Sequence, residues 1–155
     1  MPLDGLPAGV AVSELDGDGR LDVVVSVPDR GEAIVFPGRG DGTFATGRVI
    51  SVSAGVGELA VADFDGDSLP DLAVANPSAG SILLLVGTGA GAFAPSGNLP
   101  APPGVRGLMA ADANGDGYVD IVAEDSLTDR LFWWRGLGDG GFAEPLCPLT
   151  GRGPT

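Results

Sequence analysis

Oxygen-bearing side chains cluster at three places in the sequence, and their spacing suits them to bind a metal ion. Each cluster places acidic or amide side chains at the first, third, fifth and ninth positions of a nine-residue segment. The three sets are Glu14, Asp16, Asp18 and Asp22; Asp63, Asp65, Asp67 and Asp71; and Asp112, Asn114, Asp116 and Asp120. Carboxylates this close together repel one another unless a cation lies between them. Calcium binds about 6–8 oxygen ligands in a tolerant geometry, so we predict a cation site in each segment.

The residues between these side chains favour a tight loop, and they differ among the three segments. Glycine occupies the fourth position of every segment and the sixth position of the first and third. Glycine adopts positive φ readily, which lets the loop turn its odd-numbered side chains inward. Ser68 replaces the second glycine and should therefore be strained. Glu14 is one methylene longer than aspartate and must reach differently. We expect the third segment to form the most secure site.

The three segments are parts of a 49-residue repeat without insertions or deletions, since Glu14, Asp63 and Asp112 are equally spaced. A second landmark, Gly-x-Gly-x-Phe, keeps the same register. Its copies are 40–44, 89–93 and 138–142. A repeat in register predicts stacked structural units. We assign one repeat domain over residues 1–155, with units at about 5–53, 54–102 and 103–151.

Short apolar runs separated by Gly, Pro and Asp predict strands within each unit. The expected strands are 9–13, 21–27, 33–36 and a segment after Phe44 reaching about Ser53 in the first unit; 59–62, 72–75 and 82–86 in the second; and 108–111, 121–123 and 131–134 in the third. Four short strands per unit are typical of a β-propeller blade. The predicted fold class is all-β, with three four-stranded antiparallel blades.

The string Ala-Asp-Phe-Asp-Gly-Asp at 62–67, followed by Asp71 and by Gly-x-Gly-x-Phe, resembles the FG-GAP/VCBS repeat. That family includes integrin α-subunit propellers, propeller lectins and bacterial surface proteins. The resemblance covers about residues 5–149 and implies a calcium loop between the first two strands of each blade. It implies up to three Ca²⁺ ions, each with the backbone carbonyl of the seventh loop residue as a further ligand. Those residues are Arg20, Leu69 and Tyr118.

Two other interpretations of the acidic segments are less suitable. An EF-hand needs Glu at its twelfth position, where this chain has Val25, Val74 and Ala123. Asp-Gly-rich polar turns without metal are the simplest alternative, but three copies in one register favour metal binding.

Composition limits the possible partners and reactions. The formal net charge of −13 disfavours nucleic acid and anionic membranes as partners, and no apolar run is long enough for membrane insertion. The chain has no histidine, and the cation loops account for its carboxylate clusters, so we expect no enzyme activity. Cys147 is predicted to be a small buried side chain, and Trp133 and Trp134 are predicted to pack in the core.

The expected function is recognition of a protein or glycan ligand in adhesion, outside the cell or at its surface, although the N-terminus shows no signal peptide. A lectin with sugar sites between blades and a structural scaffold in a larger extracellular protein are the alternatives. Propellers have about 4–8 blades, so three blades form an arc. Two copies could close a ring as a homo-oligomer, or further blades in a longer parent chain could complete it; both alternatives stay open.

Overall fold

The computed structural model describes residues 4–150, and the side chains of residues 4–147, as three four-stranded antiparallel sheets. The strands are β1 (Gly9–Ser13), β2 (Asp22–Val27), β3 (Glu32–Phe36), β4 (Arg48–Ser51), β5 (Leu59–Ala62), β6 (Asp71–Asn76), β7 (Ser81–Gly89), β8 (Ala92–Pro100), β9 (Val105–Ala111), β10 (Asp120–Asp125), β11 (Arg130–Trp134) and β12 (Leu146–Thr150). Two short 3₁₀ helices, Pro28–Arg30 and Pro77–Ala79, lie between the second and third strands of the first two sheets. The predicted fold class is confirmed. No helix within residues 4–150 has the length and apolar character needed to cross a membrane.

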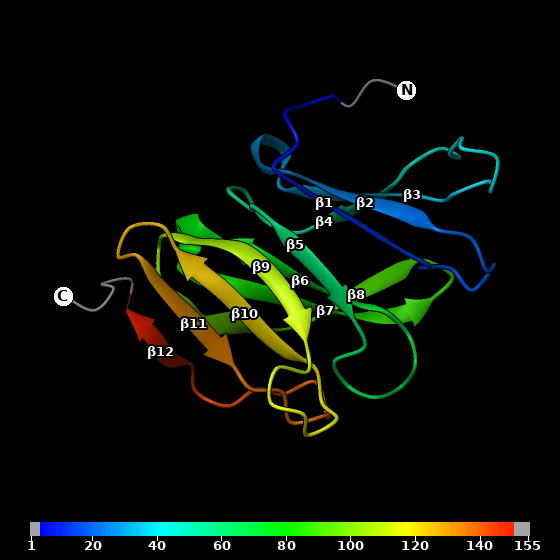
Figure 1. Ribbon diagram of the computed structural model, residues 1–155. Coiled ribbons are helices and arrows are strands. Elements are labelled where there is room, and N and C mark those ends of the chain that lie inside the picture. Colours follow the sequence, from blue (N-terminus) through cyan, green and yellow to red (C-terminus); the bar gives the residue numbers. More distant parts are fainter. Residues whose placement is uncertain (1–3, 151–155) are drawn as a thin grey trace.

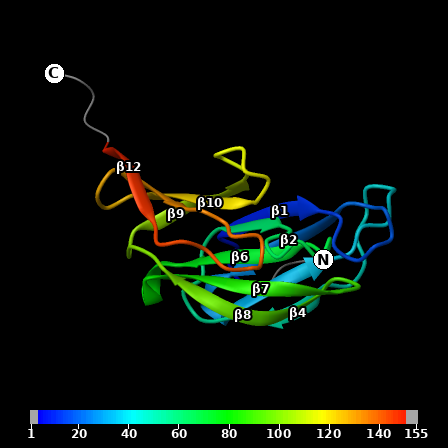
Figure 2. The ribbon, with the colours of Figure 1, turned by 90° about the horizontal axis from the view of Figure 1, so that it is seen from below.

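Each sheet is a meander in which sequential strands pair, so each corresponds to one repeat unit and is called blades 1, 2 and 3 below. Blade 2 lies between the other two, as Figure 1 shows, and its first strand β5 contacts both β1 and β9. Figure 2 shows the same arrangement from below, with β6, β7 and β8 following one another from top to bottom of the view. The first strands of the three blades therefore lie next to one another, and successive sheets pack face to face. This is how the blades of a propeller are arranged around its central channel.

Two apolar cores lie between the blades. The core between blades 1 and 2 is built around Val24, Val35, Leu72 and Val74. The core between blades 2 and 3 contains Ala73, Ile82, Ile121 and Trp134, among others. All six residues of β6 are buried, because adjacent residues of a strand face opposite sides and both sides of this sheet are covered.

The aromatic and cysteine predictions for blade 3 have different outcomes. Trp134 is buried in the core, and its indole Nε1 donates a hydrogen bond to the Pro100 carbonyl at 3.3 Å. Trp133 is half-buried on the opposite face. The prediction that Cys147 is buried is wrong, since its side chain is exposed. Cys147 lies in β12, the edge strand of the sheet, so neighbours cover this strand less completely.

Candidate metal centre

The three acidic segments are the loops that join the first strand of each blade to the second: β1 to β2, β5 to β6 and β9 to β10. We call them loops 1, 2 and 3. The ninth residue of each loop is the first residue of the second strand, so the sheet fixes its position. These residues are Asp22, Asp71 and Asp120.

The ninth-position aspartate binds two backbone segments at once. In loop 2, Asp71 Oδ2 accepts from the backbone N–H of Phe64 at 2.8 Å, and Oδ1 accepts from Gly87 at 2.7 Å. Asp22 and Asp120 make the equivalent pairs of hydrogen bonds in the other blades. All three aspartates are buried. Burial raises the pKa of Asp71, with the nearby Asp65 and Asp67 carboxylates contributing, so this carboxyl would gain from a neighbouring cation.

The first-position carboxylate organises the loop from inside. Asp63 accepts from the backbone N–H groups of Gly66 and Ser68 at 2.7 and 2.8 Å. Asp112 makes the equivalent bonds in loop 3, and the N–H of Gly117 is the main cause of its lowered pKa. Glu14 instead uses a single oxygen, Oε1, which accepts from Asp16 and Gly17. The longer side chain therefore reaches the loop differently, as its length predicts.

The third and fifth positions continue this inward arrangement. Asp16, Asp65 and Asn114 each accept from the backbone N–H of the fifth residue. The fifth residues, Asp18, Asp67 and Asp116, accept from the N–H of the seventh, at 2.8–2.9 Å. In loop 1 the exposed Arg20 side chain also pairs with Asp18 at 3.1 Å. The seventh-residue carbonyls of Arg20, Leu69 and Tyr118 stay predicted ligands.

Carboxylate oxygens converge in two of the loops. Glu14, Asp16 and Asp18 form one group, and Asp63, Asp65 and Asp71 form the other; within each, one oxygen per residue lies within 4.8 Å of the others. No third group of this kind occurs among the described residues. Loop 3 has Asn114 at its third position, so an amide replaces one of its carboxylates. The expectation that loop 3 binds metal most securely stays a prediction, which the clustering does not favour.

Each following blade contacts the loop of the blade before it, an arrangement that sequence reasoning missed. The Gly138–Gly140 turn of blade 3 reaches loop 2, where the N–H of Gly140 donates to the Phe64 carbonyl at 3.0 Å. The equivalent turn of blade 2 approaches loop 1, since a Cβ on Gly91 would lie 3.4 Å from the Asp16 Cβ. The sequence signal for this contact is that the Gly-x-Gly-x-Phe turn and the acidic loop recur with the same 49-residue period. Neighbouring blades therefore support loops 1 and 2.

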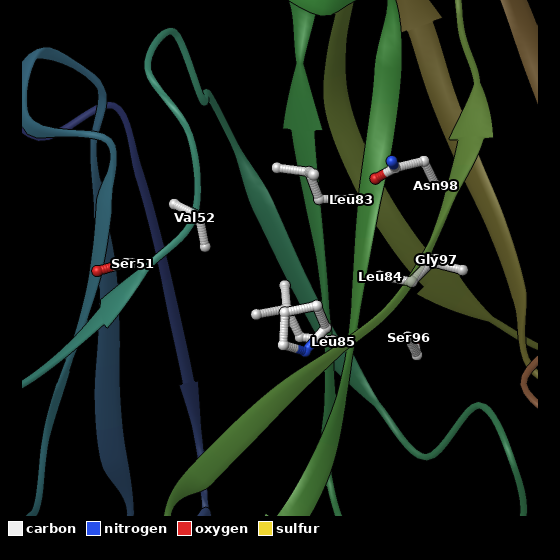
Figure 3. A pocket seen from close by; sticks show the side chains of 9 residues that line it. Ser51, Val52, Leu83, Leu84, Leu85, Ser96, Gly97 and Asn98 are labelled. Atoms are coloured by element: carbon white, nitrogen blue, oxygen red, sulfur yellow. The ribbon is translucent and has the colours of Figure 1, made fainter.

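A pocket of ≈ 230 Å³ lies between blades 1 and 2 (Figure 3), and none of its lining residues belongs to loops 1, 2 or 3. The end of β4 and the segment after it form one wall, and β7 and β8 form the others. Its lining is Ser51, Val52, Leu83, Leu84, Leu85, Pro95, Ser96, Gly97 and Asn98. Three polar side chains among aliphatic ones give it both apolar surface and hydrogen-bonding groups, as small-molecule sites require.

Comparison with known proteins gives one family match and several structural likenesses. A sequence profile of the FG-GAP-like repeat matches residues 14–74 and 63–123. A lectin of Agrocybe aegerita, described for specific recognition of non-reducing terminal N-acetylglucosamine, aligns over 90% of this chain with a TM-score of 0.61 and 20% identity. The Tc holotoxin pore of Photorhabdus luminescens aligns over 92% with a TM-score of 0.54 and 24% identity. This chain spans 37% of the lectin chain and 7% of the toxin chain. No curated protein matches it by sequence. At these identities the structural likenesses support the propeller fold alone.

Proposed function

Because the chain belongs to the FG-GAP-like repeat family, we propose that it is a calcium-binding β-propeller module that recognises a protein or glycan ligand without catalysing a reaction. The observation that carries the metal proposal is the convergence of three carboxylates within 4.8 Å in each of loops 1 and 2. Carboxylates are the hard oxygen ligands that calcium prefers. A bound cation would neutralise charges that otherwise repel one another.

The metal would act on the rigidity of the recognition surface. Each acidic loop joins the first strand of its blade to the second. Blade 2 contacts loop 1, and blade 3 contacts loop 2. Calcium held there would fix strand and blade positions together. We propose a location outside the cell or at its surface, where calcium modules work with dissociation constants of about 10⁻⁴–10⁻³ M.

A lectin is the more specific candidate within this function. The pocket between blades 1 and 2 favours it, because three polar side chains there could bind sugar hydroxyl groups while the leucines cover an apolar face. The structurally similar fungal lectin is described as recognising terminal N-acetylglucosamine. An array of glycans with varied terminal sugars tests this candidate, and the absence of any bound glycan would leave a protein as the ligand.

Thermal unfolding with and without calcium tests the metal proposal. A ligand that binds the folded state alone, at 100 times its dissociation constant, stabilises it by about 2.7 kcal/mol per site. Three divalent cations would also change the formal net charge from −13 to −7, which reduces self-repulsion. We expect a clear rise in melting temperature with millimolar calcium and a fall with chelator. An unchanged melting temperature in chelator would overturn the proposal.

Single substitutions show whether the loops are the sites. Asp16→Ala, Asp65→Ala and Asp116→Ala each remove a central ligand from one loop, so each should lower calcium affinity or stoichiometry in calorimetry. Asp29→Ala is the matched control, because Asp29 is exposed and lies in the first 3₁₀ helix rather than in a loop. Equal calcium binding by all four variants would place the metal elsewhere.

A further inference from the structure

Each blade has two faces, and the structure shows how they pair. Strand residues on one face of blade 2, including Leu59 and Leu72, pack against blade 1. Residues on the opposite face, including Ala60 and Ala73, pack against blade 3. We call these the leading and trailing faces. In both contacts the trailing face of one blade packs against the leading face of the next.

The 49-residue register identifies the leading face of blade 1. Its residues are Val10, Val12, Val23, Val25, Ile34 and Phe36, which pair across β1, β2 and β3. Val10 is 65% exposed, whereas its equivalents Leu59 and Leu108 are 5% and 8% exposed. Val12 is 58% exposed as well, whereas Val25 is 6% exposed, so the uncovered part of this apolar face is centred on β1.

The trailing face of blade 3 is the second uncovered surface. It includes Met109, Val122, Leu131 and Trp133, on strands β9, β10 and β11. Met109 is 64% exposed, whereas its equivalent Ala60 is buried between blades 2 and 3. Val122, Leu131 and Trp133 are only half-buried on this face.

We propose that two copies of this chain associate, with the leading face of blade 1 in each copy packed against the trailing face of blade 3 in the other. One uncovered face is a leading face and the other is a trailing face, and both contacts between blades within the chain pair a leading face with a trailing face. Two such contacts related by a two-fold axis close six blades into a ring, within the range of about 4–8 blades that propellers have. The proposal rests on sheet packing and is independent of the calcium and ligand proposals.

Glu124 limits the strength of this contact. It lies on the trailing face of blade 3 and is exposed, while the equivalent Ser26 and Ala75 are fully buried. Burial of an unpaired carboxylate is costly, so the contact between copies should be weaker than those within the chain. Glu124→Ala, which introduces the residue of blade 2, should lower the dissociation constant of the dimer. A raised or unchanged constant would overturn the proposed contact.

Light scattering on a size-exclusion column measures the assembly of the full chain. At tens of micromolar protein and about 0.15 M salt, which screens the net charge, we expect twice the chain mass of 15.4 kDa. Val10→Lys should raise the dissociation constant about 100-fold or more, because it places a charge in the contact. Val49→Lys is the matched control: Val49 is 58% exposed on the same face, and its equivalent Asn98 stays exposed beside blade 1. Val49→Lys should leave the dimer unchanged.

A mixing experiment tests the head-to-tail arrangement. Val10→Lys alters blade 1 and Met109→Glu alters blade 3, so each variant alone should be monomeric. Equal mixing should restore a dimer, since one of the two contacts then joins unaltered faces. A monomeric wild-type chain, an open-ended larger assembly, or a dimer that survives Met109→Glu alone would overturn the proposal. Failure of the mixture to associate would do the same.

Discussion

Ser68 adopts a backbone conformation that serine rarely takes. Its φ is 69°, and the glycines at the same loop position, Gly19 and Gly117, have φ of 80° and 92°. The left-handed region costs a non-glycine residue about 1–2 kcal/mol. Ser68 therefore keeps the loop geometry at the expense of stability, and its backbone N–H still donates to Asp63. The sequence predicted this strain from the glycine register.

Ser68→Gly should stabilise the chain by about 0.5–1 kcal/mol, because the relief of strain exceeds the extra freedom of glycine in the unfolded state. The reverse substitution Gly117→Ser should destabilise it by a similar amount. A Cβ on Gly117 meets no atom within 4 Å, so backbone strain alone would be measured. Denaturant unfolding in chelator checks both variants without the effect of metal. Destabilisation by Ser68→Gly would show that the hydroxyl group has another role.

The positions of the acidic side chains within the loops were predictable, while the hydrogen bonds of the ninth residue were not. Residue type and spacing predicted Asp71 to be an oxygen ligand of a metal, and that role stays a prediction. Its hydrogen bond to Gly87 joins the loop to the end of the third strand's ladder, and that contact depends on how the blade folds. The sequence pattern treats Asn114 as an oxygen ligand equivalent to aspartate. Among the described residues, however, three carboxylates converge in loops 1 and 2 and not in loop 3, where Asn114 replaces an aspartate.

At the scale of the element, one glycine in each blade lets the acidic loop lie against its own sheet. Gly38, Gly87 and Gly136 donate to the ninth-position aspartates. A Cβ at any of the three would collide with the backbone carbonyl of the eighth loop residue. Glycine is required because the neighbour is backbone and cannot rotate away.

Gly87→Ala should destabilise the chain by about 3 kcal/mol, the upper range for overpacking, because the methyl group would displace the Pro70 carbonyl. Gly97→Ala is the matched control in the paired strand β8. A Cβ on Gly97 meets nothing within 4 Å, so its effect should stay within about 0.5 kcal/mol. Chemical denaturation of both variants gives the comparison, and a tolerated Gly87→Ala would show that the loop can move away from the sheet.

Strand positions were predicted well where apolar runs are bounded by turn residues, and less well at the hairpin of blade 2. The predicted strands 9–13 and 59–62 match β1 and β5. β7 extends to Gly89, beyond the predicted 82–86, because its ladder with β8 continues to the Gly-x-Gly turn. In blades 1 and 3 the same region forms an isolated bridge, such as Gly38 with Phe44. The apolar pattern ends before the turn in all three blades, so nothing in the apolar pattern indicates this difference.

At the scale of the whole molecule, blade 2 connects the two cores. One face of β6 contributes Leu72 and Val74 to the core with blade 1, and the other contributes Ala73 and Ala75 to the core with blade 3. Stability of stacked repeats is the sum of the unit stabilities and the contacts between neighbours. The repeat period predicted this stacking, but not which side chains fill each contact.

Leu72→Ala measures how far the blades depend on one another. Leu72 is fully buried against blade 1, so its truncation should cost about 2–5 kcal/mol. Val49→Ala removes fewer apolar atoms from an exposed position of blade 1 and should cost about 0.5 kcal/mol or less. Coupled blades should unfold in one transition that Leu72→Ala shifts as a whole, seen equally by near-ultraviolet circular dichroism of the blade 3 tryptophans and by far-ultraviolet signal. Unfolding of blade 2 with the tryptophan signal of blade 3 unchanged would mean that the contacts between blades contribute little to stability.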